Sequence, residues 1–279
     1  MKLLGAILKH PSGRIGGIII LAYLLLALAS ALGLTPHDPI GQDRLHRLSP
    51  PDARYWMGTD LFGRDVLSRL MVGIRQSFVV AFASVAVASV AGTLIGLLSA
   101  WWSGWWDAIL MRVMDILLAF PAILLALLIV AVIGPGTVTS VVAIAIVYTP
   151  IFARVARGPA LSLKSREFVE AAKTFGSSET YILTRHLLLN LVAPLTVQVT
   201  LALAWALLTE AALSFLGLGT QPPDPSLGLM LSDSKNLMET APWLMIFPGL
   251  AVMLGILGFN LFGDALRDLL DPRSRARQA

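Results

Sequence analysis

Three ionisable side chains stand within or beside long apolar segments and could act as an acid or a base: Asp115, His186 and Glu210. A catalytic acid and base must lie within hydrogen-bond reach of one substrate. The order of the apolar segments places these three near opposite membrane faces, which argues against an integral-membrane enzyme. We expect Asp115 to pair with Arg112, one turn earlier, and Glu210 to bond backbone or neighbouring helices near the outer end of its segment. The alternatives are a ligand contact for Asp115 and a water-filled path for Glu210.

Other catalytic and cofactor motifs are missing from the sequence. No GxxxxGK[ST] phosphate loop occurs, so the chain is not expected to hydrolyse ATP itself. There is no cysteine, no HExxH and no serine with a neighbouring His and Asp. We therefore expect no enzyme activity, no metal, no cofactor and no nucleic acid for this chain. The four histidines are too scattered for a metal site: His10, His37, His46 and His186.

The composition predicts an all-α integral membrane protein. Of 279 residues only 14% are charged, and the mean hydropathy is +0.77. A bilayer core needs about 20 apolar residues in a helix. Gly134-Pro135-Gly136 separates two such helices, and Pro121 is expected to bend the earlier one. The six predicted spans are Ile15–Leu34, Phe78–Ala100, Val113–Ile133, Val138–Ala153, Leu187–Gly217 and Pro242–Phe262.

The distribution of Lys and Arg predicts the orientation. With six spans both termini share one side, which holds fourteen basic residues against seven on the other. Because the richer side is cytoplasmic, we expect cytoplasmic termini. Ala29-Ser30-Ala31 resembles a cleavage site, but the apolar stretch before it suits an anchor better than a cleaved signal peptide.

A polar insert between the fourth and fifth spans reads as helix, glycine hinge, helix. Ser165 is the expected N-cap of the first helix, Gly176 follows its end, and Ser177 or Ser178 caps the next helix, which runs from Glu179 into the fifth span. An apolar stripe should face water on the first helix. That stripe suits either a membrane surface or a docking partner. It consists of Phe168, Ala171, Ala172 and Phe175.

The same insert resembles the EAA loop of bacterial ABC importer permeases. Glu170-Ala171-Ala172, Gly176 and His186-Leu187-Leu188-Leu189-Asn190 carry the likeness, with Leu189 where a proline is common. The resemblance implies a coupling helix that sits in a groove of a separate ATPase subunit and carries its motion to the spans. The residues it assigns to ATPase coupling are Phe168, Glu170, Ala171, Ala172, Phe175, Gly176, Ile182, His186 and Asn190.

A second motif precedes the second span on the outer side. Its turn and helix start should be held by ion pairs of Asp65 with Arg64 and Arg69. As the string GTDxxGRDxxSRLxxGxRxS it resembles the second-type permease of the dipeptide, oligopeptide and nickel importers, and Glu210–Gly219 strengthens that likeness. The motif residues are Gly58, Thr59, Asp60, Gly63, Arg64, Asp65 and Arg75.

The resemblance implies a type I ABC importer permease fold with six transmembrane helices. Residues 1–76 would form the N-terminal segment, first span and external loop, and 77–279 a five-helix core with the coupling loop at 154–190. The implied partners are a second, related permease, two ATPase subunits using ATP and Mg, and an external solute-binding protein, in a bacterial inner membrane. An autonomous secondary carrier is the remaining rival, but the paired internal repeats of such carriers are not evident.

Overall fold

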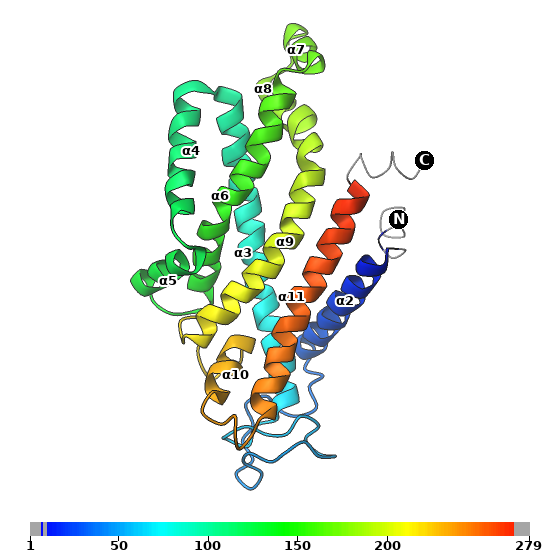
Figure 1. Cartoon of the computed structure of the whole chain (residues 1–279), viewed down its shortest axis with the longest axis vertical. Helices are drawn as coiled ribbons and strands as arrows, with labels where there is room; N and C mark the ends of the chain where they lie inside the picture. The colour runs from blue at the N-terminus through cyan, green and yellow to red at the C-terminus, as the bar shows by residue number, and fades with distance from the viewer. Residues whose placement is uncertain (1–6, 8–9, 271–279) are drawn as a thin grey trace.

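The computed structural model describes residues 7 and 10–270, and this part of the chain is a bundle of long helices (Figure 1). The long helices coincide with the apolar segments, as expected where lipid leaves no water to satisfy backbone groups. The elements are α2 (Pro11–Ala31), α3 (Val66–Trp102), α4 (Gly104–Ala119), α5 (Ala122–Ile133), α6 (Thr137–Lys164), α7 (Glu167–Thr174), α8 (Glu179–Tyr181), the π-helix η1 (Ile182–Leu188), α9 (Leu189–Phe215), α10 (Leu227–Ser234) and α11 (Trp243–Leu270).

The third predicted span is wrong as a single helix from Val113 to Ile133. Instead α4 begins at Gly104, and α4 and α5 meet at 96°. The break lies at Phe120, whose backbone is extended (φ −87°, ψ 141°), immediately before Pro121. A proline disfavours helical backbone in the preceding residue, which explains the position of the break. Five helices are long and apolar enough to cross a membrane, and the bent pair makes up to six spans within the described residues.

The longest helix, α3, packs most extensively against α6. Small residues allow this approach: a Cβ on Gly92 would lie 2.5 Å from the Cβ of Phe152. Close backbone contact through glycine is a common way to join helices in lipid, where dispersion and packing hold helices together. The α3–α6 pair therefore forms a firm centre on which the other elements are arranged.

The first and last long helices run side by side. Gly16 of α2 lies against the backbone of α11, where an added Cβ would be 2.6 Å from the Phe262 nitrogen. His10 Nε2 is 3.7 Å from Asp268 Oδ2. The start of α2 and the end of α11 thus lie at the same end of the bundle, the end that carries α7 (Figure 1). Several basic residues used to predict orientation, among them Lys2, Lys9 and Arg273, lie outside the described residues.

Candidate functional site

The short helix α7 projects from one end of the bundle (Figure 1). Its N-cap is Arg166 and not Ser165, because Ser165 Oγ instead donates to the Ser162 carbonyl at 3.2 Å. At its end Gly176 adopts φ +77°, and the Ser177 N–H donates to the Ala172 carbonyl at 3.0 Å. A left-handed residue after a helix favours glycine strongly, so the predicted hinge is confirmed.

One face of α7 is buried and the other is bare. Val169 is fully buried in a small apolar cluster, and half-buried Ala172 packs against the same cluster. On the other face Phe168 is 43% exposed and Phe175 is 88% exposed, with Ala171 also exposed. The predicted stripe is therefore divided, since Ala172 faces the bundle. The other buried members of the cluster are Leu97, Ala100, Trp101, Ala156, Ala160, Ile182, Leu187 and Leu191.

The C-terminal end of α3 is joined to α7 by a cation–π contact. Lys173 Nζ lies 4.8 Å from the centre of the Trp101 ring. Beside it Lys164 Nζ donates to the Ala100 carbonyl at 3.1 Å and to Ser103 Oγ at 2.9 Å, at the carbonyl end of α3 where cations are favoured. Sequence reasoning missed Val169 and Lys173. The sequence offers one local signal for them: Val169 is apolar, Lys173 is basic, and both lie on a different face of the helix from Phe168.

The connection from α7 to α9 passes through a π-helix. Ser178 caps α8 by accepting from the Tyr181 N–H at 3.3 Å, which confirms the second predicted N-cap. The His186 ring lies 5.8 Å from Phe168 of α7 and 5.5 Å from Tyr181, so it stands between the two helices. Asn190 Nδ2 donates to the His186 carbonyl at 2.6 Å. The predicted coupling residues on both sides of the hinge are thus brought together, while the Glu170 side chain stays exposed.

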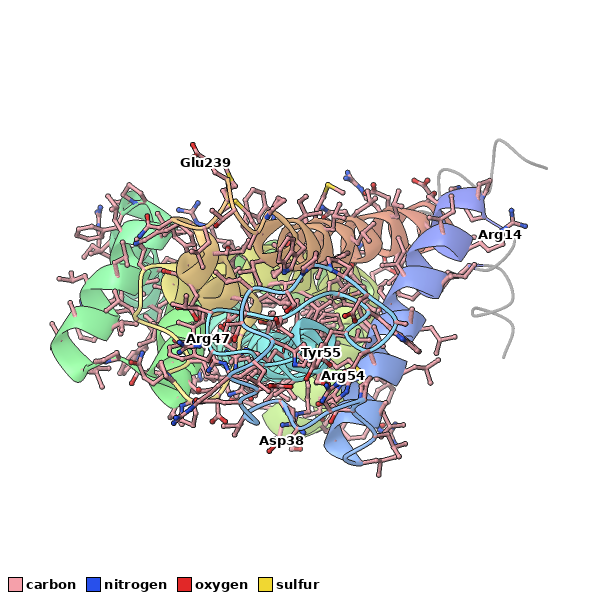
Figure 2. All side chains as sticks on the ribbon, turned by 90° about the horizontal axis from the view of Figure 1, so that it is seen from below. Arg14, Asp38, Arg47, Arg54, Tyr55 and Glu239 are labelled. Carbon is pink, nitrogen blue, oxygen red and sulfur yellow. The ribbon has the colours of Figure 1, made fainter. Side chains whose placement is uncertain are left out.

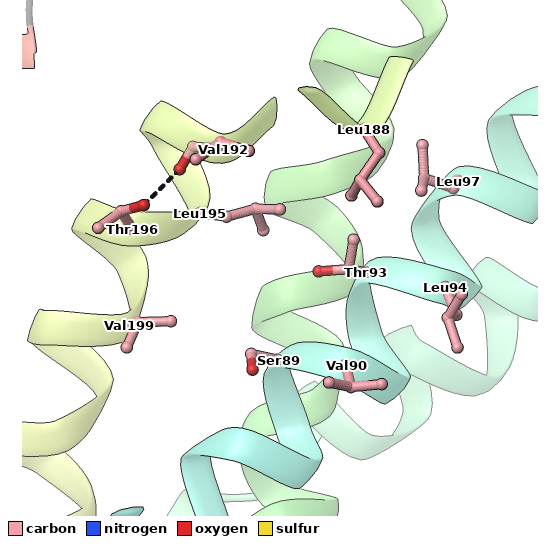
Figure 3. A pocket seen from close by; sticks show the side chains of 10 residues that line it. All are labelled: Ser89, Val90, Thr93, Leu94, Leu97, Leu188, Val192, Leu195, Thr196 and Val199. Atoms are coloured by element: carbon pink, nitrogen blue, oxygen red, sulfur yellow. Dashed lines mark hydrogen bonds between the residues drawn. The ribbon is translucent and has the colours of Figure 1, made fainter. Parts of the chain in front are cut away.

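Just beyond η1, a cavity of about 500 Å³ separates α3 from the first turns of α9 (Figure 3). Leu94 and Leu97 line it from α3, and Val192 and Leu195 line it from α9. The Thr196 hydroxyl does not reach across but donates to the Val192 carbonyl at 2.6 Å on its own helix. Beside the cavity Leu97 and Leu191 still belong to one buried cluster, so the two helices are separated only along the cavity. π-Helical turns occur often at functional hinges.

Two ion pairs join α4 to α6. Arg157 donates to both carboxylate oxygens of Asp107, at 2.7 and 2.6 Å, and the two side chains are 32% and 18% exposed. Arg154 Nη2 lies 2.6 Å from Asp115 Oδ1, and both of those side chains are about half exposed. The expected pair of Asp115 with Arg112 is therefore wrong. The broken α4–α5 span places Asp115 in the last turns of α4, where α6 offers a closer cation.

At the other end of the bundle, the motif of residues 58–77 builds the start of α3. Asp65 is the N-cap of α3 and accepts from the Ser68 N–H at 3.0 Å. The expected pairing of Asp65 with the arginines is wrong, because Asp60 takes them instead: Arg64 Nε lies 2.6 Å from Asp60 Oδ2, and Arg69 Nε lies 3.6 Å from it. The capping role leaves Asp65 facing the helix backbone, whereas Asp60 faces the guanidinium groups.

The remaining motif residues hold the loop before α3 to the helices. Gly63 has φ +78°, and an added Cβ would collide with the Asp43 carbonyl. The Ser49 N–H donates to Thr59 Oγ1 at 2.9 Å. Arg75 reaches from α3 to the Ser30 carbonyl at the end of α2, at 3.3 Å. These contacts support a structural role for the motif.

The loop itself, in which Figure 2 labels Arg54 and Tyr55, is closed by a polar cluster around Asp43. His46 Nδ1 lies 2.8 Å from Asp43 Oδ2, and the Tyr55 hydroxyl donates to the same oxygen at 3.1 Å. Arg54 Nη2 is 3.4 Å from it. The hydrogen bond with His46 is the main cause that lowers the pKa of Asp43 below its usual value.

Glu210 lies near the end of α9 and is 1% exposed. One carboxyl oxygen accepts from the Ser214 hydroxyl at 2.7 Å, on the same helix. Asp115 in α4 and His186 in η1 belong to other parts of the bundle, so the structure does not bring the three together. Among the described residues there is also no group of three side chains that could hold a metal ion. Within this part of the chain, the candidate functional site is the α7 helix together with its junction with α9.

Comparisons with known proteins identify the family of the chain. Residues 92–276 match the family described as binding-protein-dependent transport system inner membrane component. The chain is 45% identical to a dipeptide transport system permease protein of Alkalihalophilus pseudofirmus over 96% of its length and 88% of the relative. It is 43% identical to a glutathione transport system permease protein of Pectobacterium atrosepticum, over 91% of this chain and 85% of the relative.

A comparison with solved structures gives the same fold class. An inward-facing structure of the MetNI methionine ABC transporter superposes with a TM-score of 0.60 at 17% identity, over 73% of this chain and 96% of that one. The predicted all-α fold of an ABC importer permease is thus confirmed. The chain belongs to the family of inner-membrane components of binding-protein-dependent transport systems, and it is a permease subunit, not itself an enzyme.

Proposed function

We propose that this permease carries short peptides inward across the bacterial inner membrane as part of an ATP-driven complex. The observation that carries the proposal is the geometry of α7, which is held to the bundle through Val169 and presents Phe168 and Phe175 bare. Such a helix suits a docking ridge, because within the described residues Phe175 is 88% exposed and Phe168, beside His186, is 43% exposed. The names of the relatives, which refer to dipeptides, peptides and glutathione, support peptide cargo over nickel.

The partners follow from the same proposal. Two ATPase subunits bind ATP and Mg and receive α7, a second related permease completes the path, and an external solute-binding protein delivers cargo. The end of the bundle that carries α7 then faces the cytoplasm, and with it the start of α2 and the end of α11. This permease contributes no covalent step and no cofactor of its own.

In this proposal motion passes along one continuous stretch of chain. Closure of the ATPase dimer displaces α7, and the displacement reaches α9 through α8 and η1, whose π-turns accommodate it. The cavity between α3 and the start of α9 gives α9 space to shift. Glu170, exposed beside the hinge, faces the partner, while Ile182, His186 and Asn190 hold the junction.

The test is uptake by the reconstituted complex with its binding protein, comparing labelled dipeptides with nickel. We expect ATP-dependent accumulation of dipeptide inside the vesicles. The double substitution of Glu170→Ala and Gly176→Ala should abolish uptake and the stimulation of ATPase activity, since alanine at φ +77° costs about 1–2 kcal/mol and disturbs the hinge. Glu239→Gln, at the other end of the bundle, is the matched control and should transport normally.

Two results would contradict the proposal. Normal uptake by the double variant would mean that α7 does not couple to the ATPase. Uptake that needs no ATPase subunits would indicate a secondary carrier instead. Cysteine crosslinking settles the contact directly, because the chain has no cysteine of its own. A cysteine at Phe175 should capture an ATPase subunit.

A further inference from the structure

A small pocket opens at the outer end of the bundle, between the loop before α3, the first turn of α3, and α10. Its volume is about 220 Å³, below the range of roughly 300–1,000 Å³ that drug-sized ligands occupy. Its walls are mostly apolar, with Phe62, Met230 and Leu237 among them. Four charged side chains also line it, two of each sign: Asp60, Arg64, Arg69 and Asp233.

Arg69 is the feature that distinguishes this pocket from an ordinary surface hollow. Its side chain is only 4% exposed. Yet within the described residues it makes one hydrogen bond, from Nη1 to the Pro39 carbonyl at 3.2 Å, and its nearest carboxylate, Asp60, is 3.6 Å away. Arg64 already engages Asp60 at 2.6 Å. A guanidinium carries five N–H donors, and the contacts with Pro39 and Asp60 do not use all of them. Because Arg69 lines the pocket, its remaining donors are available to a carboxylate that enters from outside this chain.

Asp233 supplies the opposite charge in the same pocket. No hydrogen bond or ion pair within the described part of the chain engages its carboxylate. Asp233 is exposed to solvent on one side, and partial desolvation on the pocket side raises its pKa, while Arg69 and Arg64 lower it. Asp60 pairs with Arg64 at 2.6 Å and more loosely with Arg69 at 3.6 Å, so Arg69 and Asp233 are the two charges with capacity to meet a ligand.

We propose that this pocket binds the two charged ends of a short peptide, with the peptide carboxylate at Arg69 and its ammonium group at Asp233. The balance of charges favours a zwitterion, the volume favours a ligand of very few residues, and the apolar wall accommodates a side chain. The pocket lies at the end of the bundle opposite α7, where cargo arrives. The assignment rests on the proposed function, because it takes the cargo to be peptide.

The experiment uses the full transport complex in lipid nanodiscs without its binding protein. Binding of Ala-Ala, N-acetyl-Ala-Ala and Ala-Ala-amide is measured by saturation-transfer NMR at millimolar concentration. We expect Ala-Ala to bind more tightly than either blocked form. Asp233→Asn should weaken Ala-Ala roughly tenfold, the loss of one charge-assisted hydrogen bond, and leave N-acetyl-Ala-Ala unchanged. Arg69→Lys should weaken Ala-Ala and leave the amide unchanged.

The control is Glu239→Gln, an exposed carboxylate at the same end but outside the pocket (Figure 2). Equal binding of the three peptides, or equal behaviour of Asp233→Asn and Glu239→Gln, would overturn the proposal. If Asp233→Asn lowered the affinity of the complex for its solute-binding protein and left the affinity for Ala-Ala unchanged, the pocket would be a protein-docking site. The proposal would then be wrong. If Arg69→Lys does not fold, the peptide-binding measurements with Asp233→Asn still test the proposal.

Uptake by the wild-type complex, measured in parallel with its binding protein, separates this inference from the proposed function. Peptide uptake without peptide binding at the pocket would refute only the pocket. Absence of any peptide uptake would refute the proposed function itself.

Discussion

Lys173 of α7 stands 4.8 Å above the ring of Trp101, the penultimate residue of α3. The contact joins the helix proposed to meet the ATPase to the longest helix of the bundle. Through Ser68 and Arg75 that same helix reaches the outer loop and the end of α2. A displacement of α7 can therefore act on α3 as well as on α9.

Replacing Lys173 by Gln should uncouple transport from ATP hydrolysis. A cation–π contact contributes about 0.5–1 kcal/mol at an exposed site, so the fold should survive its loss. We expect ATPase stimulation to persist while peptide uptake per ATP falls roughly two- to fivefold. Lys173→Arg should behave as wild type, because a guanidinium also stacks on an indole.

A double-mutant cycle with Trp101→Leu checks that the two residues act together. If they do, the double variant should be no worse than either single one. Lys235→Gln, at the outer end, is the matched control for loss of a lysine charge. Additive losses would show that Lys173 and Trp101 act independently and would remove the basis for a second route through α3.

The two faces of α7 predict opposite consequences for serine substitutions. Phe175 is 88% exposed, so Phe175→Ser should change the free energy of unfolding by less than about 0.5 kcal/mol and yet abolish capture of the ATPase. Val169 is fully buried, so Val169→Ser should lower the free energy of unfolding by about 2–4 kcal/mol. Unfolding in mixed micelles and co-purification with the ATPase measure the two effects. Loss of stability in Phe175→Ser would show that its side chain is covered within this chain.

The two ion pairs between α4 and α6 should differ in their contribution to stability. Asp107 is 18% exposed and accepts two hydrogen bonds from Arg157, so Asp107→Asn should destabilise the protein by about 1–2 kcal/mol. Asp115 and Arg154 are about half exposed, and Asp115→Asn should cost less than about 1 kcal/mol. The double variant Asp107→Arg with Arg157→Asp, which exchanges the two charges, should recover part of the free energy of unfolding that either substitution alone removes. Equal effects at the two sites would contradict the burial argument.

Local signals in the sequence were enough to place the hinge. Gly176 and Ser178 act on residues next to them in the chain, so a glycine after a helical stripe and a serine before the next helix indicate their roles directly. The exposed stripe was mostly predictable for the same reason. What could not be predicted was its division: Ala172 faces the bundle only because Trp101 and Leu97 come to lie beside α7.

Contacts between distant segments were beyond reach of the sequence. Arg112 is the nearest cation to Asp115 along the chain, yet Arg154 is the nearest in space because α4 and α6 run side by side. Pro121 indicated a bend, but a bend of 96° depends on what α5 packs against. Likewise the spacing in the sequence allows either Asp60 or Asp65 to pair with the arginines. Because Asp65 caps the start of α3, Asp60 is the one that pairs with them.

The Asp43 cluster predicts that the outer loop loosens in acid. The folded pKa of Asp43 is lowered, chiefly by the hydrogen bond with His46, so its contribution to stability is present above the unfolded pKa of about 3.9 and is lost as the pH falls through the folded value. A spin label at Leu45→Cys, a position 92% exposed, reports the loop alone. We expect its mobility to be constant from pH 7 to 5 and to rise as the pH falls below about 4. Asp43→Asn should give the mobile spectrum already at pH 7, with no further change in acid. If the label instead loosened on raising the pH, or if Asp43→Asn kept the acid transition, the carboxylate of Asp43 would not be what closes the loop.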